Sequence, residues 1–116
     1  MTHTEHAELR RLIRSDFDYD AMMQCAWLLS AEYPFLGFGY LGESAAGRGI
    51  PRFSLGEGKK EVYFVGVHHG AERITGAVLV QFLCNHICQH ITFSIVNRVK
   101  YVVDILHISF YTAFIF

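Results

Sequence analysis

Two neighbouring stretches of the chain carry the clearest hydrophobic patterns, the first typical of a strand and the second of a helix. Residues 62–67 form a run of β-branched and aromatic residues broken only by Gly66, which predicts a strand buried on both faces. Residues 77–83 form an apolar segment that predicts a helix. The turn between them, residues 68–72, is polar, and open α/β sheets present ligand-binding groups at turns that leave the carboxyl end of a strand. We therefore expect a functional site within residues 61–83.

The segment upstream predicts a helix over residues 17–33. Asp16 or Asp18 can cap this helix, and Pro34 ends it. Apolar residues at helical spacing predict one buried stripe, made of Met22, Met23, Ala26, Trp27, Leu28 and Leu29. We expect these side chains to lie in the core, because amphipathic helices of small domains normally bury such a stripe.

Residues 35–55 predict two short strands joined by a turn. The first includes Phe38 and Tyr40, the second covers residues 50–55, and a Gly-rich connection at residues 44–49 joins them. We expect Arg48, within the connection, to have a structural role and to pair with an acidic group, with a direct substrate contact as the alternative.

Beyond residue 83 the predicted helix continues with two pairs of metal-binding side chains, Cys84 with Cys88 and His86 with His90. The members of each pair are four residues apart and share a helix face. The two pairs are offset by two residues and point to different sides of the helix, which argues against a second zinc site. We expect two buried cysteines and two histidines on a more solvated face.

The last stretch, residues 91–116, is rich in β-branched and aromatic residues and ends in the uncharged run 105–116. A run of about a dozen residues is too short to cross a bilayer as a helix, because the hydrocarbon core is about 30 Å thick. The run predicts a buried strand and no membrane span.

Composition and charge narrow the class of protein. A length of 116 residues, 52% hydrophobic and 18% charged, fits one small folded domain and excludes a disordered chain. A net charge of -1 without a basic cluster excludes a nucleic-acid-binding surface. The three cysteines form no disulfide framework, and the polar start of the chain contains no signal-peptide core. We therefore expect reduced thiols and a cytoplasmic protein.

The polar turn contains candidate metal ligands. His69 and Glu72 are three residues apart, so a helical turn brings the imidazole and the carboxylate to one point. Both groups bind zinc, and a catalytic zinc keeps three protein ligands and one water. Gly70 permits a tight turn between strand and helix. The alternative is a surface turn in which Glu72 complements the positive end of the following helix.

This stretch resembles the metal motif of the zinc carboxypeptidase family, the carboxypeptidase A-like metallopeptidases. In that family a histidine and a glutamate at this spacing stand between a core strand and a helix, after a glycine and before an isoleucine and a threonine. Here these residues are Gly66, His69, Glu72, Ile74 and Thr75. Two further blocks occur upstream in the family's order: residues 19–34 are similar to its opening helix, and residues 41–50 to its hairpin.

The resemblance covers residues 17–83, follows a polar segment at residues 1–16 and is weak over residues 84–116. It implies the amino-terminal part of an α/β/α domain, with a mixed sheet flanked by helices. In such a domain the strand after the metal-site helix pairs beside the strand at residues 62–67. The resemblance also implies hydrolysis of peptide bonds near a free carboxyl terminus by zinc-activated water, on peptides that in bacterial relatives belong to the cell wall.

In the resembled family the third metal ligand is a histidine and the general base a glutamate, both well downstream of the metal motif. Downstream of Glu72 this chain has no glutamate and one aspartate, Asp104, so we identify no catalytic base. The histidines left for the third ligand are His86, His90 and His107, and we favour His107 because it falls in the predicted neighbouring strand. Arg73 and Arg98 are the arginines left for a substrate clamp. We therefore expect a truncated chain that is inactive alone, the alternatives being a non-catalytic peptide-binding module and a defective fragment.

Overall fold

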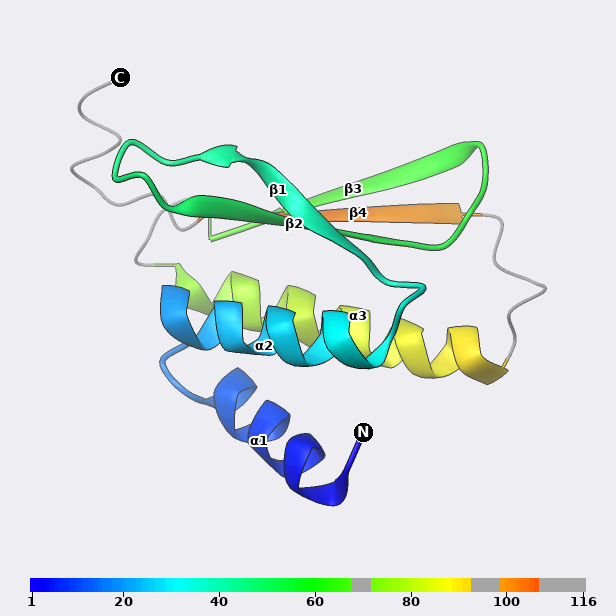
Figure 1. Cartoon of the computed structure of the whole chain (residues 1–116). Coiled ribbons are helices and arrows are strands. Elements are labelled where there is room, and N and C mark those ends of the chain that lie inside the picture. Colours follow the sequence, from blue (N-terminus) through cyan, green and yellow to red (C-terminus); the bar gives the residue numbers. More distant parts are fainter. Residues whose placement is uncertain (68–71, 93–98, 107–116) are drawn as a thin grey trace.

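The computed structural model describes residues 1–67, 72–92 and 99–106, without the side chains of residues 88–92. Within them the elements follow in the order α1 (His3–Arg14), α2 (Tyr19–Glu32), β1 (Gly37–Glu43), β2 (Gly49–Leu55), β3 (Lys60–Gly66), α3 (Arg73–Thr92) and β4 (Val99–Ile105). The helices lie on one face of the sheet, α2 and α3 directly against it and α1 on their far side (Figure 1). The chain is an α/β protein, as predicted, and the described helices cover one of the two faces of the sheet.

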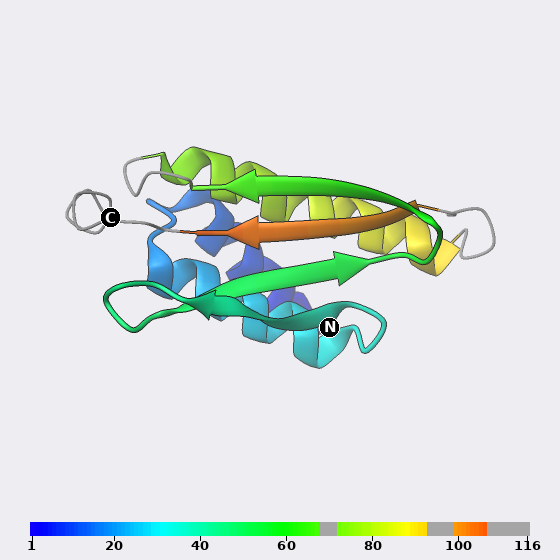
Figure 2. The ribbon, with the colours of Figure 1, turned by 90° about the horizontal axis from the view of Figure 1, so that it is seen from above.

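The sheet is mixed, with its strands in the order β1-β2-β4-β3. β1 pairs with β2 and β2 with β4 in antiparallel orientation, whereas β4 and β3 are parallel. A hairpin joins β1 to β2, while α3 carries the chain back so that β4 runs in the direction of β3 (Figure 2). The strand beside β3 thus exists, but it lies earlier than the predicted run. Of that run, residues 107–116 lie outside the described residues.

The hydrophobic core fills the space between the sheet and the helices. Alternate residues of the two central strands point into it, because successive side chains of a strand face opposite sides. The fully buried apolar side chains include Phe53 and Leu55 of β2, Val103 and Ile105 of β4, Met22, Leu29, Val80, Leu83 and Ile87 of the helices, and Phe17 and Val67 of the connections. Within the described residues, none of the helices combines the length and apolar character needed to cross a bilayer.

β3 is exposed on one face, so the prediction that it is buried on both faces is wrong. Val62 and Phe64 point to the helices, and the ring centroid of Phe64 lies 5.0 Å from that of Phe82 on α3. Tyr63 and Val65 point the other way and are 52% and 43% exposed. β3 forms an edge of the described sheet, and no described helix covers its outer face. The apolar run at residues 62–65 therefore does not indicate that the strand is buried on both faces.

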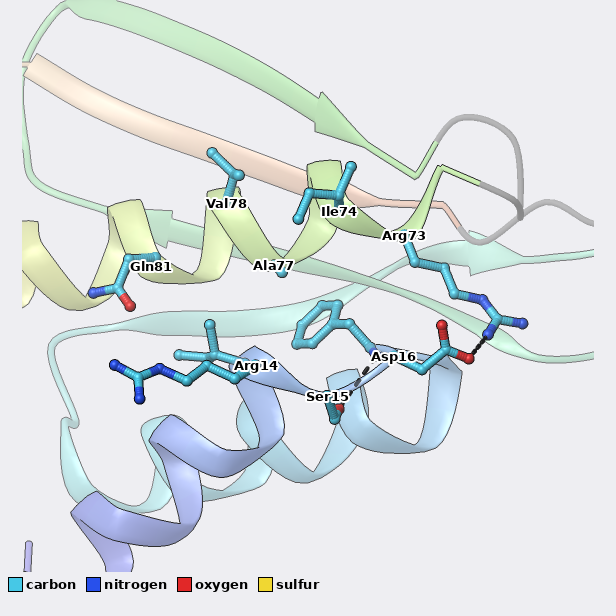
Figure 3. Close-up of a pocket in the computed structure, with 10 residues that line it drawn as sticks. Arg14, Ser15, Asp16, Arg73, Ile74, Ala77, Val78 and Gln81 are labelled. Carbon is cyan, nitrogen blue, oxygen red and sulfur yellow. Dashed lines mark hydrogen bonds and ion pairs between the residues drawn. The ribbon is translucent and has the colours of Figure 1, made fainter.

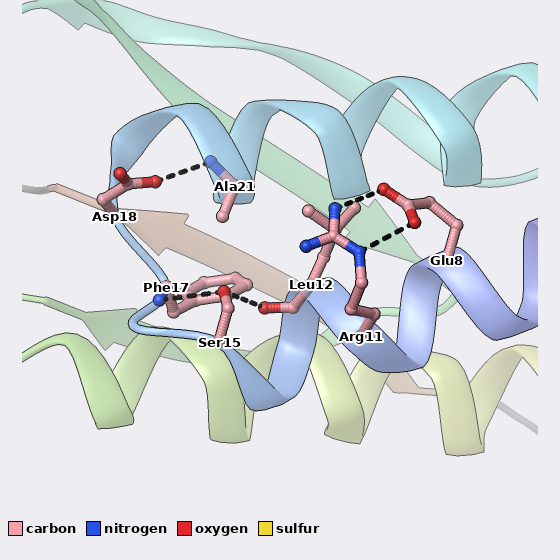
Figure 4. A network of polar contacts seen from close by, with 7 residues as sticks. All are labelled: Glu8, Arg11, Leu12, Ser15, Phe17, Asp18 and Ala21. Atoms are coloured by element: carbon pink, nitrogen blue, oxygen red, sulfur yellow. Dashed lines mark hydrogen bonds and ion pairs between the residues drawn. The ribbon is translucent and has the colours of Figure 1, made fainter.

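α2 confirms the helix predicted at residues 17–33, with a later start. Asp18 is the N-cap, and its carboxylate accepts a 2.9 Å hydrogen bond from the N–H of Ala21 (Figure 4). The predicted stripe is confirmed at Met22, Met23, Ala26 and Leu29, which are buried, and at Leu28, which is partly buried. The prediction that Trp27 lies in the core is wrong, because its side chain is 58% exposed. Cys25 is buried instead. α2 packs between α1 and the sheet, and Trp27 lies on an exposed side of the helix.

The amino-terminal segment, expected to be a polar stretch, forms helix α1 and contributes to the core. Thr2 and Glu5 make a capping box, in which each side chain accepts a hydrogen bond from the backbone N–H of the other, at 3.1 and 2.8 Å. Leu9 and Leu12 are buried on the side that packs against α2 and α3. Ser15 ends the helix by donating a 2.6 Å hydrogen bond from its hydroxyl to the carbonyl of Leu12 (Figure 4).

Candidate functional site

The parallel strands that precede the predicted ligands His69 and His107, β3 and β4, end side by side. The N–H of Leu106, the residue after β4, donates a 3.0 Å hydrogen bond to the carbonyl of Gly66, the last residue of β3. Of the predicted zinc ligands, the structure describes Glu72, while His69 and His107 lie outside the described residues. Gly66 and Leu106 are thus adjacent at the points from which the sequence continues toward the two histidines.

Glu72 immediately precedes α3 and is exposed. In the part of the chain that the structure describes, its carboxylate has no hydrogen-bond or ion-pair partner. A carboxylate at this position is stabilised by the positive amino end of the helix. The exposed position of the side chain is compatible with metal binding and equally with the helix-capping alternative.

The side chain of Thr75 ties together the two ends of the turn. Its hydroxyl accepts a 2.7 Å hydrogen bond from the N–H of Val67 and donates a 2.8 Å hydrogen bond to the carbonyl of Glu72. The N–H of Thr75 donates to the same carbonyl at 3.2 Å. Val67 and Glu72 flank residues 68–71, so one side chain fixes the backbone on both sides of the segment that contains His69.

Two glycines let α3 pack closely against the end of β3. A Cβ on Gly76 would lie 2.5 Å from Cγ2 of Val67 and 3.2 Å from Cε2 of Phe17. A Cβ on Gly66 would lie 2.6 Å from Cδ1 of Leu79. Val67 also has a φ of 49°, which is a strained conformation for a β-branched residue. The backbone that enters the turn is therefore held by tight packing as well as by Thr75.

An open groove lies beside this junction, between the first turns of α3 and the corner that joins α1 to α2 (Figure 3). Its volume is about 510 Å³, and its lining comprises Ile13, Arg14, Ser15, Asp16, Phe17, Arg73, Ile74, Ala77, Val78 and Gln81. At one end the guanidinium of Arg73 pairs with the carboxylate of Asp16 (Figure 3). Arg73, a candidate substrate clamp, is therefore engaged by an acid, and Arg98 lies outside the described residues.

Asp104, the only acidic residue after Glu72 in the sequence, is fully buried in the sheet. It lies opposite Arg52 in the β2–β4 pair and accepts hydrogen bonds from Nε and Nη2 of that residue, each at 2.8 Å. The hydroxyl of Tyr63 donates to the same carboxylate. The hydrogen bonds to Asp104 raise the pKa of Arg52. A carboxylate held in this network is not available as a general base.

Of the two Cys and His pairs on α3, the structure describes the side chains of Cys84 and His86. Cys84 is half-buried, and the ring centroid of His86 lies 4.0 Å from that of Phe82 and 4.9 Å from that of Tyr101. Cys84 and His86 are both half-buried, so the expected contrast between a buried cysteine and a more solvated histidine is not seen at these two positions, and the ring of His86 belongs to an aromatic cluster between α3 and the sheet. The side chains of Cys88 and His90 are not described. Among the described residues no group of three or more His, Cys, Asp or Glu side chains could hold a metal.

Arg48 has a structural contact, as predicted, but with an aromatic ring in place of an acid. Its guanidinium carbon lies 4.9 Å from the ring centroid of Tyr19, at the start of α2, in a cation–π contact. The Tyr19 hydroxyl donates a 2.8 Å hydrogen bond to the carbonyl of Gly49. Both contacts fasten the β1–β2 hairpin to α2.

The sequence pattern assigned neither Val67 nor Thr75 a role in holding the turn. The isoleucine and threonine after the motif belong to the resemblance, but the hydrogen bonds of Thr75 are visible only in three dimensions. Comparison of the chain with models of known protein families and with curated proteins finds no match.

Proposed function

We propose that the chain is a zinc-binding member of the carboxypeptidase A-like metallopeptidases. His69 and Glu72 hold the metal, and His107 is the candidate third ligand. The peptides that the family hydrolyses have a free carboxyl terminus and include cell-wall peptides. The observation that carries the proposal is that the parallel strands β3 and β4 end side by side, where the N–H of Leu106 donates a hydrogen bond to the carbonyl of Gly66.

The donor set fits zinc, because imidazole nitrogen and carboxylate oxygen are both common zinc ligands. Within the described residues the exposed Glu72 carboxylate is engaged by no other group. The Thr75 hydroxyl restrains the backbone at Val67 and Glu72, so the turn that carries His69 starts and ends at fixed points. Restrained ligands lose less conformational entropy when they bind a metal.

A bound zinc would supply a Lewis acid and lower the pKa of its water. The chain's own residues hold and orient the ligands: Thr75 fixes the backbone ends of the turn, and Gly66 and Gly76 allow β3 and α3 to approach. Hydrolysis also requires a group that takes a proton from the water. Asp104 cannot do so from its place in the Arg52 network, and we therefore propose that the 116-residue chain binds zinc without hydrolysing peptides.

Isothermal titration calorimetry with zinc tests the metal site. The wild-type chain is expected to bind zinc, and His69→Ala and Glu72→Gln are each expected to weaken binding by about tenfold or more. His6→Ala on α1 and Glu57→Gln in the β2–β3 loop are matched controls at exposed positions, and both should keep the wild-type affinity. Equal binding by the wild type and His69→Ala would eliminate the metal site.

A hydrolysis assay with a carboxypeptidase substrate tests the missing base. With zinc present, we expect the wild-type chain to show no turnover above that of Glu72→Gln. Turnover that a chelator abolishes would contradict the proposal and would mean that another group in the chain serves as the base.

A further inference from the structure

Within the described residues, one side of the molecule carries two features that no other element covers, the outer edge of β3 and an apolar ridge on α3. In the sheet formed by the described residues, β3 pairs with β4 alone. Ile74 and Val78, one turn apart, project from the same side of α3 and are 72% and 59% exposed (Figure 3). Together with Val65 of β3 they line a groove of about 250 Å³. The edge and the ridge therefore form one continuous surface, which we call the β3–α3 strip.

We infer that the β3–α3 strip binds the same strip of a second copy of this chain. In the pair, two β3 strands lie antiparallel about a two-fold axis perpendicular to the sheet. α3 runs beneath the sheet on the side of β3 (Figure 2), so the rotation that brings edge to edge also brings ridge to ridge. A single extended peptide would occupy the edge and leave Ile74 and Val78 in water, whereas a second copy covers both features at once. The inference does not depend on zinc.

The backbone of β3 has hydrogen-bonding groups directed to this edge. The N–H and C=O of one strand residue point to the same side, and neighbouring residues point to opposite sides. Because the carbonyl of Gly66 bonds to Leu106 beyond β4, the backbone of Phe64 also points to β4, while that of Tyr63 and Val65 points to the outer edge. These outward groups are a ready template for another strand.

The positions of the charged residues on β3 permit antiparallel pairing with β3 of a second copy. The seven residues of β3 are centred on Tyr63, so full antiparallel overlap sets Tyr63 of one copy opposite Tyr63 of the other. In this register Glu61 lies opposite Val65, and Lys60 lies opposite Gly66. Like charges are thus kept apart, and residues whose side chains share a sheet face are paired, as an antiparallel sheet requires. The register also pairs the residues whose backbone groups point outward.

The two outer edges of the described sheet, β1 and β3, differ in how well they are protected against pairing with another strand. β1 has an irregular register between Tyr40 and Gly42, a device that discourages edge pairing. β3 pairs in regular register over its whole length and contains no proline. A two-fold contact through β3 uses up that edge in both copies, so the assembly closes as a dimer.

Analytical ultracentrifugation of the full chain over a range of concentrations tests the inference. The wild type is expected to form dimers. Ile74→Glu places a charge on the exposed ridge, and Val65→Pro removes an outward N–H while leaving the ladder to β4 intact. Each is expected to raise the dimer Kd by about tenfold or more. Trp27→Glu, at an exposed apolar position on α2 outside the strip, should leave the dimer Kd unchanged.

Circular dichroism shows whether each variant is folded, and Ile74→Glu keeps the test decisive if Val65→Pro unfolds. A wild-type chain that stays monomeric would overturn the inference, since the edge would then be free or covered within one chain. Open-ended oligomers, or equal dissociation of the Trp27→Glu variant, would overturn it as well.

Discussion

The hydroxyl of Thr75 lies 2.7 Å from the backbone nitrogen of Val67, eight residues earlier in the chain. The same oxygen lies 2.8 Å from the carbonyl of Glu72. One side chain therefore closes a short loop between the end of β3 and the start of α3. This oxygen therefore holds the backbone at Val67 and at Glu72, the described residues on either side of the turn.

Replacing Thr75 by valine is expected to lower the free energy of unfolding by about 1 kcal/mol, because the Val67 N–H loses its acceptor while the volume of the side chain is preserved. If the turn holds zinc, the same change should weaken zinc binding by about tenfold. Urea unfolding and calorimetry measure the two effects. Thr75→Ser keeps the oxygen and should restore most of both; a serine variant as weak as the valine one would contradict the role of the hydroxyl.

Gly76→Ala is expected to destabilise the fold although alanine is the better helix former. The gain in helix propensity is about 1 kcal/mol. The new methyl would lie 2.5 Å from Val67 and 3.2 Å from Phe17, and overpacking of this kind costs about 1–3 kcal/mol. The net loss should appear as a lower urea midpoint. Gly39→Ala, where a Cβ meets open space, is the matched control and should stay within about 0.5 kcal/mol of the wild type.

Removing the guanidinium from the buried carboxylate is expected to weaken the sheet. Arg52→Met keeps most of the side-chain volume but takes two hydrogen bonds from Asp104. We expect a loss of about 2 kcal/mol, less than for a fully buried pair because solvent reaches Arg52. Chemical unfolding measures it. Arg11→Met breaks the exposed pair with Glu8 and should leave the midpoint unchanged, so similar effects of both variants would argue against special importance of the buried pair.

The buried thiol of Cys25 predicts a loss of stability at alkaline pH. Burial raises the pKa of Cys25 from its ordinary value of 9.0 to about 12. The folded state thus keeps a proton that the unfolded state loses. The contribution of the protonated thiol to the free energy of unfolding is complete below pH 9.0. It falls by about 1.4 kcal/mol per pH unit as the pH rises toward 12.

Unfolding at a series of alkaline pH values measures this effect for the wild type and for Cys25→Ala. The wild type should lose stability more steeply than the variant. Parallel curves would show that the thiol is not protected in the folded state.

Much of the fold could be predicted from local patterns. Helical spacing located α2 and α3, and runs of β-branched and aromatic residues with Gly-rich turns located β1, β2 and β3. α1 was missed although Thr2 and Glu5 form a capping box, because the charged residues around Leu9 and Leu12 hide a narrow apolar stripe. The exposure of Tyr63 could not be predicted, since it depends on which layers cover the sheet.

The site was less accessible to sequence reasoning than the fold. The spacing of His69 and Glu72 is local and can be read directly, but what holds their turn comes from other elements. The network of Asp104 joins residues 52 positions apart, and the approach of Phe17 to α3 depends on how two helices meet. Such relationships follow from tertiary packing and leave no periodic signal in the sequence.

The place of β4 has a consequence for the order in which the chain assembles. β2 and β3 do not pair with each other; both pair with β4, which follows them in sequence by more than 30 residues. During synthesis the β1–β2 hairpin can form early, whereas β3 can pair with its neighbour in the described sheet only after β4 has left the ribosome. The described sheet therefore becomes continuous only when β4 inserts between β2 and β3.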